Sequence, residues 1–383
     1  MTSGRLRVLR IIDRLNVGGP ALQTVVLTEG LDPARFEQRI VTGTVDAEEG
    51  DYVALRAPEL PVERIQGLGR SPQPWKDAQA WTHLVRTMHR FRPHIVHTHK
   101  AKAGVLGRSA AWTARVPVTI HSFHGHLLHG YFSPRATRGV VAVERAFARR
   151  TTKLVAVGAQ VRDDLLAAGV GRAEQYVVVP PGVPIRIARD KVQARRELDL
   201  PLEGPVVGFV GRLTRVKQPE RFVDVALEVS RAHPEAVFVV AGDGELLHKL
   251  RDRARPLGQR MVFLGWRQDV ETVYAACDLL VLTSDNEGMP VAVIEAASVG
   301  TPTVTTRVGS APEVVIDGVT GFVTSTDVAA LARATNRLLD DADLRDRMGS
   351  AAAEVARNRF SAARLVSDIA ELYECTAAEH GVI

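Results

Sequence analysis

The chain has 383 residues, of which 45% are hydrophobic and 24% charged, and its formal net charge at pH 7 is +5. This length predicts two or three domains, each large enough to bury a core, and the composition excludes disordered, collagen-like and coiled-coil chains. Two cysteines are too few for a disulfide framework and suit a reducing compartment. No apolar run approaches the roughly 20 residues of a membrane span, and arginines interrupt the first apolar residues, where a secretory signal would need an unbroken apolar run. We therefore expect a cytoplasmic protein.

The first half of the chain alternates short β-branched runs with stretches of 3.6-residue periodicity. Strands are predicted at residues 6–12, 95–98, 118–121, 154–157 and 176–179, and helices at 21–31, 78–89 and 134–150. Two adjacent prolines and a glycine within residues 179–184 cannot continue a helix or a central strand, so a linker is predicted there.

The second half repeats this alternation. Strands are predicted at residues 206–210, 236–241, 261–264, 279–283 and 303–306, and helices at 219–232, 245–253, 290–300 and, amphipathic, 362–378. Steady repetition of strand and helix predicts the α/β class, with two doubly wound, Rossmann-like domains that face each other across an interdomain cleft.

The charge is divided unevenly between the two halves. Residues 1–183 carry 25 Lys and Arg against 15 Asp and Glu, whereas the remainder carries 24 against 29. Residues 78–162 contain 14 basic residues, nine histidines and one acidic residue, Glu144. Such a field attracts anions, but the 5% aromatic content and the lack of a recognition motif argue against nucleic acid. A phosphate-bearing acceptor or an anionic lipid surface fits, as does a solvated basic face. The helix at 134–150 could lie on a bilayer or pack within its domain.

The most informative segment follows the fourth predicted strand of the second half. Glu287, Gly288 and Met289 precede Pro290, which suits the first helical position, and the free N–H groups at the start of that helix favour an anion or a hydroxyl. Gly288 allows a ligand to approach the backbone. Glu295 lies in an almost wholly apolar helix, so we expect it to be buried and to bind ligand hydroxyls, an arginine or a backbone amide. Glu287 is expected to point into the same cleft.

A second candidate loop follows the strand predicted at 206–210. Arg212 and Lys217 place two cations at the end of this strand, after Gly211, and together they would suit a diphosphate. The loop is neither a Walker loop nor a Gly-x-Gly-x-x-Gly fingerprint. A third loop, with Gly242 and Gly244, follows the next strand and is a turn signal.

In this order the segments resemble the retaining glycosyltransferases of family 4, which have the GT-B fold. The motifs of the second half are Gly211-Arg212-Leu213 with Lys217, Ala241-Gly242-Asp243-Gly244, Phe263-Leu264-Gly265-Trp266, and Glu287-Gly288-Met289-Pro290 with Glu295, which meets the Glu-x7-Glu spacing of that family. Looser matches in the first half are Asn16-Val17-Gly18-Gly19-Pro20, His97-Thr98-His99 and Ser122-Phe123-His124-Gly125.

The resemblance implies an acceptor-side domain at residues 1–180, a donor-binding domain at 186–361, and a C-terminal helix at about 362–383 that packs back on the first domain. It implies catalytic roles for His124, Arg212, Lys217 and Glu287. It implies donor-binding roles for Gly18, Gly19, Arg212, Lys217, Gly242, Trp266, Arg267, Glu287, Gly288, Met289, Pro290 and Glu295. Within that set Arg212 and Lys217 would bind the diphosphate and Glu295 the ribose.

The implied activity is transfer of a sugar, with retention of configuration, from a UDP-linked nucleotide sugar to a glycan, lipid-linked or small-molecule acceptor in cell-envelope or other glycoconjugate synthesis. No metal and no cofactor beyond the donor are expected, since the histidines at 97, 99, 121, 124, 126 and 129 match no closed four-ligand set. The protein could be peripheral to the membrane. The alternatives are a nucleotide-sugar epimerase, which would isomerise the donor without an acceptor, and a non-catalytic nucleotide-binding protein, which would tolerate loss of Glu287.

Overall fold

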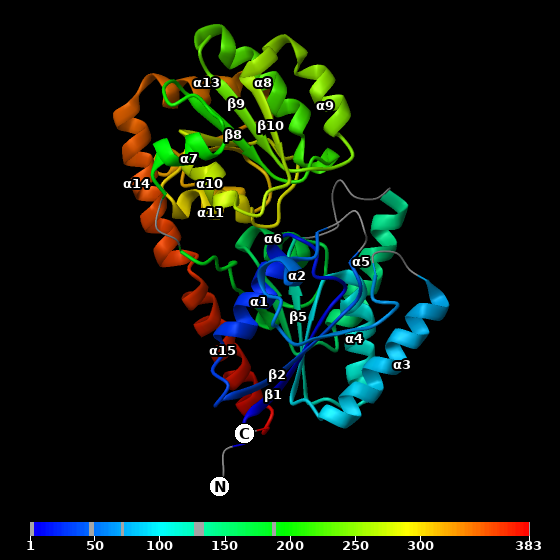
Figure 1. The fold of residues 1–383 in the computed structure, drawn as a ribbon. Helices are drawn as coiled ribbons and strands as arrows, with labels where there is room; N and C mark the ends of the chain where they lie inside the picture. The colour runs from blue at the N-terminus through cyan, green and yellow to red at the C-terminus, as the bar shows by residue number, and fades with distance from the viewer. Residues whose placement is uncertain (1–3, 46–49, 70–72, 126–133, 186–188, 383) are drawn as a thin grey trace. The chain divides into compact units, whose positions relative to one another are not determined.

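The computed structural model describes residues 4–45, 50–69, 73–125, 134–185 and 189–382. The chain forms two compact units (Figure 1). Unit 1 contains the described residues up to Gly182 and those from Ala362 onward, and unit 2 runs from Val183 to Ser361. The passage from unit 1 to unit 2 therefore lies in the proline-containing segment at 179–184.

Unit 1 is built on a parallel seven-stranded sheet with the order β3-β2-β1-β4-β5-β6-β7. Its strands are β1 (Leu6–Ile12), β2 (Phe36–Thr42), β3 (Val62–Arg64), β4 (Ile95–His99), β5 (Val118–Phe123), β6 (Lys153–Ala156) and β7 (Tyr176–Val178). Its helices are α1 (Gly19–Gly30), α2 (Tyr52–Arg56), α3 (Pro74–Phe91), α4 (Ala101–Thr113), α5 (Pro134–Ala148), α6 (Ala159–Ala167) and α15 (Ala362–Glu379). The C-terminal helix α15 packs against α1, so the end of the chain completes the unit in which the chain begins (Figure 1).

Unit 2 is built on a parallel six-stranded sheet with the order β10-β9-β8-β11-β12-β13. Its strands are β8 (Val206–Val210), β9 (Val237–Ala241), β10 (Met261–Gly265), β11 (Leu279–Leu282), β12 (Thr303–Thr306) and β13 (Gly321–Thr324). Its helices are α7 (Lys191–Glu197), α8 (Pro219–Ala232), α9 (Leu247–Arg253), α10 (Val270–Ala276), α11 (Val291–Ser298), α12 (Ala311–Val314), α13 (Val328–Asp340) and α14 (Ala342–Arg359).

All ten predicted strands are present, with ends within two residues of the prediction. Three further strands, β2, β3 and β13, were not predicted. The β2 sequence places Glu37, Gln38 and Arg39 in succession, which breaks the apolar run that marks a buried strand, and β3 and β13 have only three and four residues. The start of α11 also differs from the prediction, because Pro290 has an extended ψ of 100° and precedes the helix as its N-cap.

The strand order reverses once in each sheet, between β1 and β4 in unit 1 and between β8 and β11 in unit 2. At such a point the loops that leave the carboxyl ends of the two strands diverge, which is where α/β proteins bind ligands. The cores beneath these strand ends are apolar: Leu9 and Ile11 are fully buried in unit 1, as are Phe209 and Phe222 in unit 2.

Among the described residues, no helix combines the length and the apolar character that crossing a bilayer requires.

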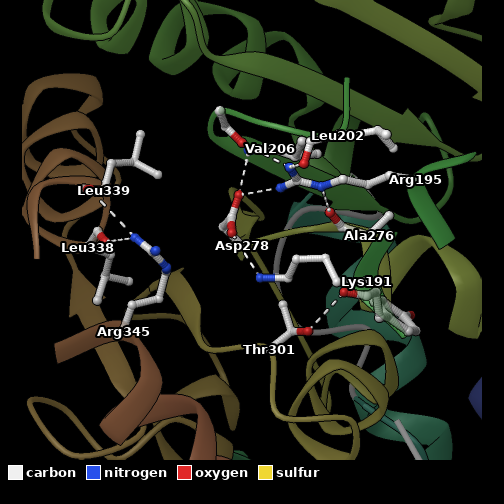
Figure 2. A network of polar contacts seen from close by, with 12 residues as sticks. Lys191, Arg195, Leu202, Val206, Ala276, Asp278, Thr301, Leu338, Leu339 and Arg345 are labelled. Carbon is white, nitrogen blue, oxygen red and sulfur yellow. Dashed lines mark hydrogen bonds and ion pairs between the residues drawn. The ribbon is translucent and has the colours of Figure 1, made fainter. Parts of the chain in front are cut away.

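A polar network fixes the opposite, amino-terminal edge of the unit 2 sheet (Figure 2). Asp278, just before β11, accepts hydrogen bonds from the Arg195 guanidinium at 2.8 Å, the backbone N–H of Val206 at 2.7 Å and Lys191 at 2.9 Å. Arg195, whose side chain is 4% exposed, also donates to carbonyl groups of Ala276, Leu202 and Gly204. The network therefore ties helix α7 to the first residues of two neighbouring strands.

Because this ion pair is buried, removing one partner leaves a desolvated charge. We expect Asp278→Ala to lower the free energy of unfolding by about 3–5 kcal/mol, since Arg195 and the Val206 N–H both lose their acceptor. Asp278→Asn, which keeps an oxygen acceptor, should cost less. Chemical denaturation measures both, with Arg231→Ala as the control, because the Arg231–Glu228 pair is exposed and should contribute under 1 kcal/mol. Equal effects of Asp278→Ala and Arg231→Ala would contradict this account.

Candidate functional site

Three candidate residues of unit 2 lie where the strand order of its sheet reverses. The loop after β8 carries Arg212 and Lys217, and the loop after β11 carries Glu287. These two strands are neighbours, so the two loops start side by side. The topology brings together residues that are 70 positions apart in the sequence.

Lys217 and Glu287 are in direct contact. The Lys217 ammonium lies 2.6 Å from Glu287 Oε1, and the Ser284 hydroxyl donates to the same oxygen at 2.6 Å. Glu287 is buried, with a side chain 7% exposed, and Lys217 is 21% exposed. A buried carboxylate needs such partners to remain charged. A ligand phosphate that bound Lys217 would compete with Glu287 for the ammonium group.

Three residues that the sequence analysis gave no role hold this contact in place. Asp285 accepts hydrogen bonds from Arg221 at 2.8 Å and Gln218 at 2.7 Å, and its backbone N–H donates to the Val216 carbonyl at 2.9 Å. Arg221 also donates to the Thr283 carbonyl at 2.5 Å. Several hydrogen bonds thus connect the loop that carries Glu287 to the loop that carries Lys217 and to the start of α8. No motif marks Arg221, because its importance depends on the loop that the fold places opposite it.

At two glycines of this region, the backbone of a neighbouring loop lies so close that a Cβ atom would not fit. A Cβ on Gly242 would lie 1.9 Å from the Gly211 carbonyl oxygen, and a Cβ on Gly309 would lie 1.7 Å from the Glu287 carbonyl oxygen. The φ values are +147° and +47°, in the region that favours glycine. In this structure Gly242 therefore supports the loop that carries Arg212, and Gly309 supports the loop that carries Glu287.

The second carboxylate, Glu295, is in a different environment from the one expected. Its side chain is half-buried rather than buried, and its Oε2 accepts a hydrogen bond from the Tyr274 hydroxyl at 2.9 Å. The Tyr274 phenol is thus one partner of the Glu295 carboxylate. Burial, followed by the charge of Glu295, raises the pKa of Tyr274 well above its usual value, so the phenol keeps its proton and donates. The buried carboxylate of this pair is Glu287.

Three further unit 2 candidates differ in their exposure and in their ion pairing. The Arg212 side chain is exposed and has no hydrogen bond or ion pair with the described residues. Trp266 is 44% exposed, which leaves its ring available for stacking, whereas Arg267 pairs with Asp269 through two contacts of 3.0 and 2.8 Å. The Arg267 bonds lower the pKa of Asp269.

The backbone residues after Glu287 have partners within the protein. The Gly288 carbonyl accepts from the Ser310 N–H at 3.2 Å, Met289 is buried, and the Pro290 carbonyl accepts from the Val293 N–H at 3.1 Å. Their placement is thus set by α11 and by the loop after β12.

In unit 1, the loop after β1 is held by Lys100. Its ammonium lies 3.0 Å from Asp13 Oδ1 and donates to Asn16 Oδ1 at 3.0 Å and to the Arg14 carbonyl at 3.1 Å. Gly18 is the N-cap of α1, with φ +152°, and Gly19 is its first residue. The two candidate glycines therefore lie at the N-terminus of α1, directly after the loop that Lys100 contacts.

Four described histidines cluster on β4, on β5 and directly after β5. His97 bonds to the Tyr373 hydroxyl and to the Ser122 hydroxyl, each at 2.7 Å, and His99 Nδ1 lies 3.0 Å from His124 Nε2. His121 bonds to the Thr98 hydroxyl at 2.8 Å.

Burial sets the charge of this cluster. It lowers the pKa of His97, His99 and His121 well below the usual value, and burial together with the Lys100 ammonium lowers the pKa of His124 to about 3. All four rings are neutral near pH 7. His126 and His129 lie outside the described residues. Within those residues, no group of three or more His, Cys, Asp or Glu side chains is arranged to hold a metal ion.

Comparison with known proteins follows the same division of the chain. Residues 190–355 match the family model "Glycosyl transferases group 1", and residues 18–182 match "Glycosyl transferase 4-like domain". A D-inositol 3-phosphate glycosyltransferase of Corynebacterium kroppenstedtii is 30% identical over 88% of this chain and 81% of the relative. A glycogen synthase of Mycobacterium tuberculosis is 31% identical over 76% and 70%. An Escherichia coli α-1,3-galactosyltransferase, named for UDP-Gal and α-D-GlcNAc-diphosphoundecaprenol, is 29% identical over 78% and 79%.

Solved structures agree on the architecture. Anabaena HepE in complex with UDP-glucose aligns with a TM-score of 0.82 and 25% identity over 97% of this chain and 100% of that chain. Sucrose-phosphate synthase of Thermosynechococcus elongatus aligns with a TM-score of 0.84 and 22% identity over 98% and 100%. Two Rossmann-like sheets with these neighbours confirm the predicted GT-B fold.

The neutral histidines make stability depend on pH. An unfolded histidine has a pKa of about 6.5 and the folded values lie below it, so the unfolded chain binds more protons as the pH falls. The contribution is fully present above about pH 7 and is lost below pH 6.5. Denaturation at pH 7.5, 6.5 and 5.5 should show this fall, with a slope of up to ~1.4 kcal/mol per pH unit for each histidine. His97→Phe should reduce the slope, and constant stability across this range would contradict the assignment.

Proposed function

The chain belongs to the group 1 glycosyl transferases, and from that premise we propose that it transfers a sugar from a UDP-linked nucleotide sugar to a phosphate-bearing acceptor. The observation that carries the proposal is the Lys217–Glu287 contact at the point where the unit 2 strand order reverses. It places one cation and one buried carboxylate side by side at the edge where an α/β sheet binds ligands.

The proposed chemistry is the control of charge. As the bond from the sugar carbon to phosphate breaks, the diphosphate gains negative charge and the sugar becomes oxocarbenium-like. Arg212 and Lys217 are proposed to stabilise the leaving diphosphate, and preorganised groups of this kind commonly supply ~3–4 kcal/mol each. Glu287 would then exchange its bond to Lys217 for hydroxyls of the transferred sugar. No metal is needed in this scheme.

Other residues have proposed supporting roles. Glu295, held by Tyr274, would bind the ribose, and the exposed Trp266 ring beside Arg267 would contact the base. Gly242 and the backbone at Gly288–Met289–Pro290 would shape the same site. In unit 1, His124, Gly18 and Gly19 are proposed to act in the same reaction. We further propose attack from the face that the diphosphate leaves, with a phosphate oxygen accepting the proton of the acceptor hydroxyl, so that the anomeric configuration is retained.

The acceptor is proposed to carry phosphate for two reasons. Residues 78–162 hold 14 basic residues and one acidic residue, and the names of two relatives specify the acceptors D-inositol 3-phosphate and α-D-GlcNAc-diphosphoundecaprenol. A lipid-linked acceptor would place the reaction in cell-envelope glycan synthesis.

Donor binding tests the proposal directly. UDP-glucose and UDP-galactose should raise the thermal unfolding temperature, because ligand at 100 times its dissociation constant adds ~2.7 kcal/mol to stability. Lys217→Ala and Arg212→Ala should abolish this shift. Arg215→Ala is the matched control, since it removes an exposed cation from the same loop and should leave the shift intact. Glu287→Gln should retain donor binding while turnover falls at least tenfold.

The same experiment separates the alternatives. An epimerase would isomerise the donor with no acceptor present, and a non-catalytic nucleotide-binding protein would keep its full function in Glu287→Gln. An NMR assignment of an inverted product would overturn retention, and equal loss of binding in all three cation variants would remove the assignment of Arg212 and Lys217.

Contact of unit 1 with an anionic bilayer is a further part of the proposal. Trp75 at the start of α3 is 85% exposed, and α5 presents Val143, 43% exposed, beside exposed arginines. The buried side of α5 is joined to α4 by the Arg108–Glu144 ion pair, at 2.8 Å. The membrane-facing side would therefore be the outer one.

Sedimentation with phosphatidylglycerol vesicles tests this contact. We expect binding at low salt that is lost at high salt, as surface charge is screened. Trp75→Ala combined with Arg149→Glu should reduce the bound fraction at least threefold, whereas Arg357→Glu on unit 2 should not change it. An absence of wild-type binding at low salt would refute the contact.

A further inference from the structure

The pair formed by His99 and His124 differs from the other histidine contacts of unit 1. His99 ends β4 and His124 follows the neighbouring strand β5, and their rings are stacked with centroids 5.2 Å apart. His99 Nδ1 and His124 Nε2 are 3.0 Å apart, which is a hydrogen bond between two imidazoles.

His99 is held rigidly. Its side chain is 2% exposed, and its ring stacks on His97 with centroids 4.3 Å apart. His97 in turn has both nitrogens occupied, by the Tyr373 hydroxyl of α15 and by the Ser122 hydroxyl. The return helix α15 therefore supports the ring on which His99 rests.

Each neutral imidazole has one N–H, so two arrangements of the bond exist. In the first, His99 Nδ1–H donates to His124 Nε2, and the His124 proton is on Nδ1. In the second, His124 Nε2–H donates to His99 Nδ1, and the His99 proton is on Nε2. The nitrogens at the two ends, His99 Nε2 and His124 Nδ1, are buried and have no hydrogen-bond partner among the described residues.

The first arrangement is favoured by the position of the two ends. A buried N–H without an acceptor is rarer in proteins than an unpaired acceptor. Because both end nitrogens are buried, each arrangement leaves one N–H without an acceptor among the described residues. The first leaves it on His124, whose side chain is partly exposed, so that a ligand can supply the acceptor. The second leaves it on His99, which is 2% exposed.

We propose that His99 is a positioning residue that fixes His124 as its Nδ1–H tautomer and so directs an N–H donor toward an oxygen of a bound hydroxylated substrate. The identity of that substrate as a sugar rests on the proposed function. The tautomer itself is a property of the chain without ligand, so the two ideas fail separately.

Long-range ¹H–¹⁵N correlation spectra of the full chain labelled in histidine test the proposal at pH 7.5. His124, assigned by its loss in His124→Asn, should show a roughly tenfold or larger excess of the Nδ1–H form over the Nε2–H form, because the Nε2–H form requires an N–H without an acceptor on the more deeply buried His99. Free histidine prefers the Nε2–H form, so the expected signal is the opposite of the default. A wild-type His124 in the Nε2–H form would overturn the proposal without any variant.

Variants of the pair separate positioning from folding. His99→Phe keeps a ring to stack on His97 but removes Nδ1, and His124 should revert to a predominantly Nε2–H form. His99→Asn places an amide donor near the position of Nδ1 and should restore the Nδ1–H form. His97→Phe, the matched control, removes a buried imidazole from the same face of β4 and should leave the His124 tautomer unchanged.

The thermal unfolding temperature, measured for each variant, reports the cost in stability. The spectra test whether His99 sets the tautomer of His124. His99 does not set it if the Nδ1–H form persists in His99→Phe, or if His99→Asn does not restore that form. Stabilisation of the wild type by UDP-glucose is measured separately, so a negative result there bears on the proposed function alone.

Discussion

The ion pair of Lys217 and Glu287 is the interaction on which the unit 2 site depends. It joins the loops that leave the two strands at which the sheet order reverses, and it gives a buried carboxylate a cationic partner. Burying a charge without a partner costs far more than leaving it in water. The surrounding bonds of Arg221 and Asp285 therefore have a clear role, since they keep the two loops close enough for the pair to form.

Both units contain buried ion pairs, but unit 1 also contains a cluster of buried imidazoles. Unit 2 retains charges and pairs them, both at Lys217–Glu287 and at the Arg195–Asp278 network on the other edge of its sheet. Unit 1 pairs Arg108 with Glu144 in the same way, and it also buries imidazoles, whose pKa values burial lowers enough to keep them neutral near pH 7. A neutral ring acts through the direction of its one N–H, whereas an ion pair acts through charge. The histidine cluster of unit 1 can accordingly act by positioning through hydrogen bonds.

Local patterns were enough to predict most of the architecture. Runs such as β8 and β11 are apolar on both faces and bounded by glycine or polar residues, so they are recognisable without partners. The same reasoning missed β2, whose Glu37 to Arg39 sequence reads as surface. It also expected Glu295 to be the buried carboxylate, because an apolar helix was assumed to be covered on every side. Burial is decided by what packs against a helix, and this information is not local.

The sequence by itself determined the α/β class, the two-unit division, the loops that carry Arg212, Lys217 and Glu287, and the resemblance that the family comparison then supported. Only the tertiary structure decided which of these residues meet. Lys217 bonds to Glu287, which is 70 positions away in the sequence, and Arg221 donates a hydrogen bond to Asp285. The Tyr373 hydroxyl of the last helix is hydrogen-bonded to His97. The physical reason is that strand order is set by long-range packing, and hydrogen-bond partners across neighbouring strands exist only once that order is fixed.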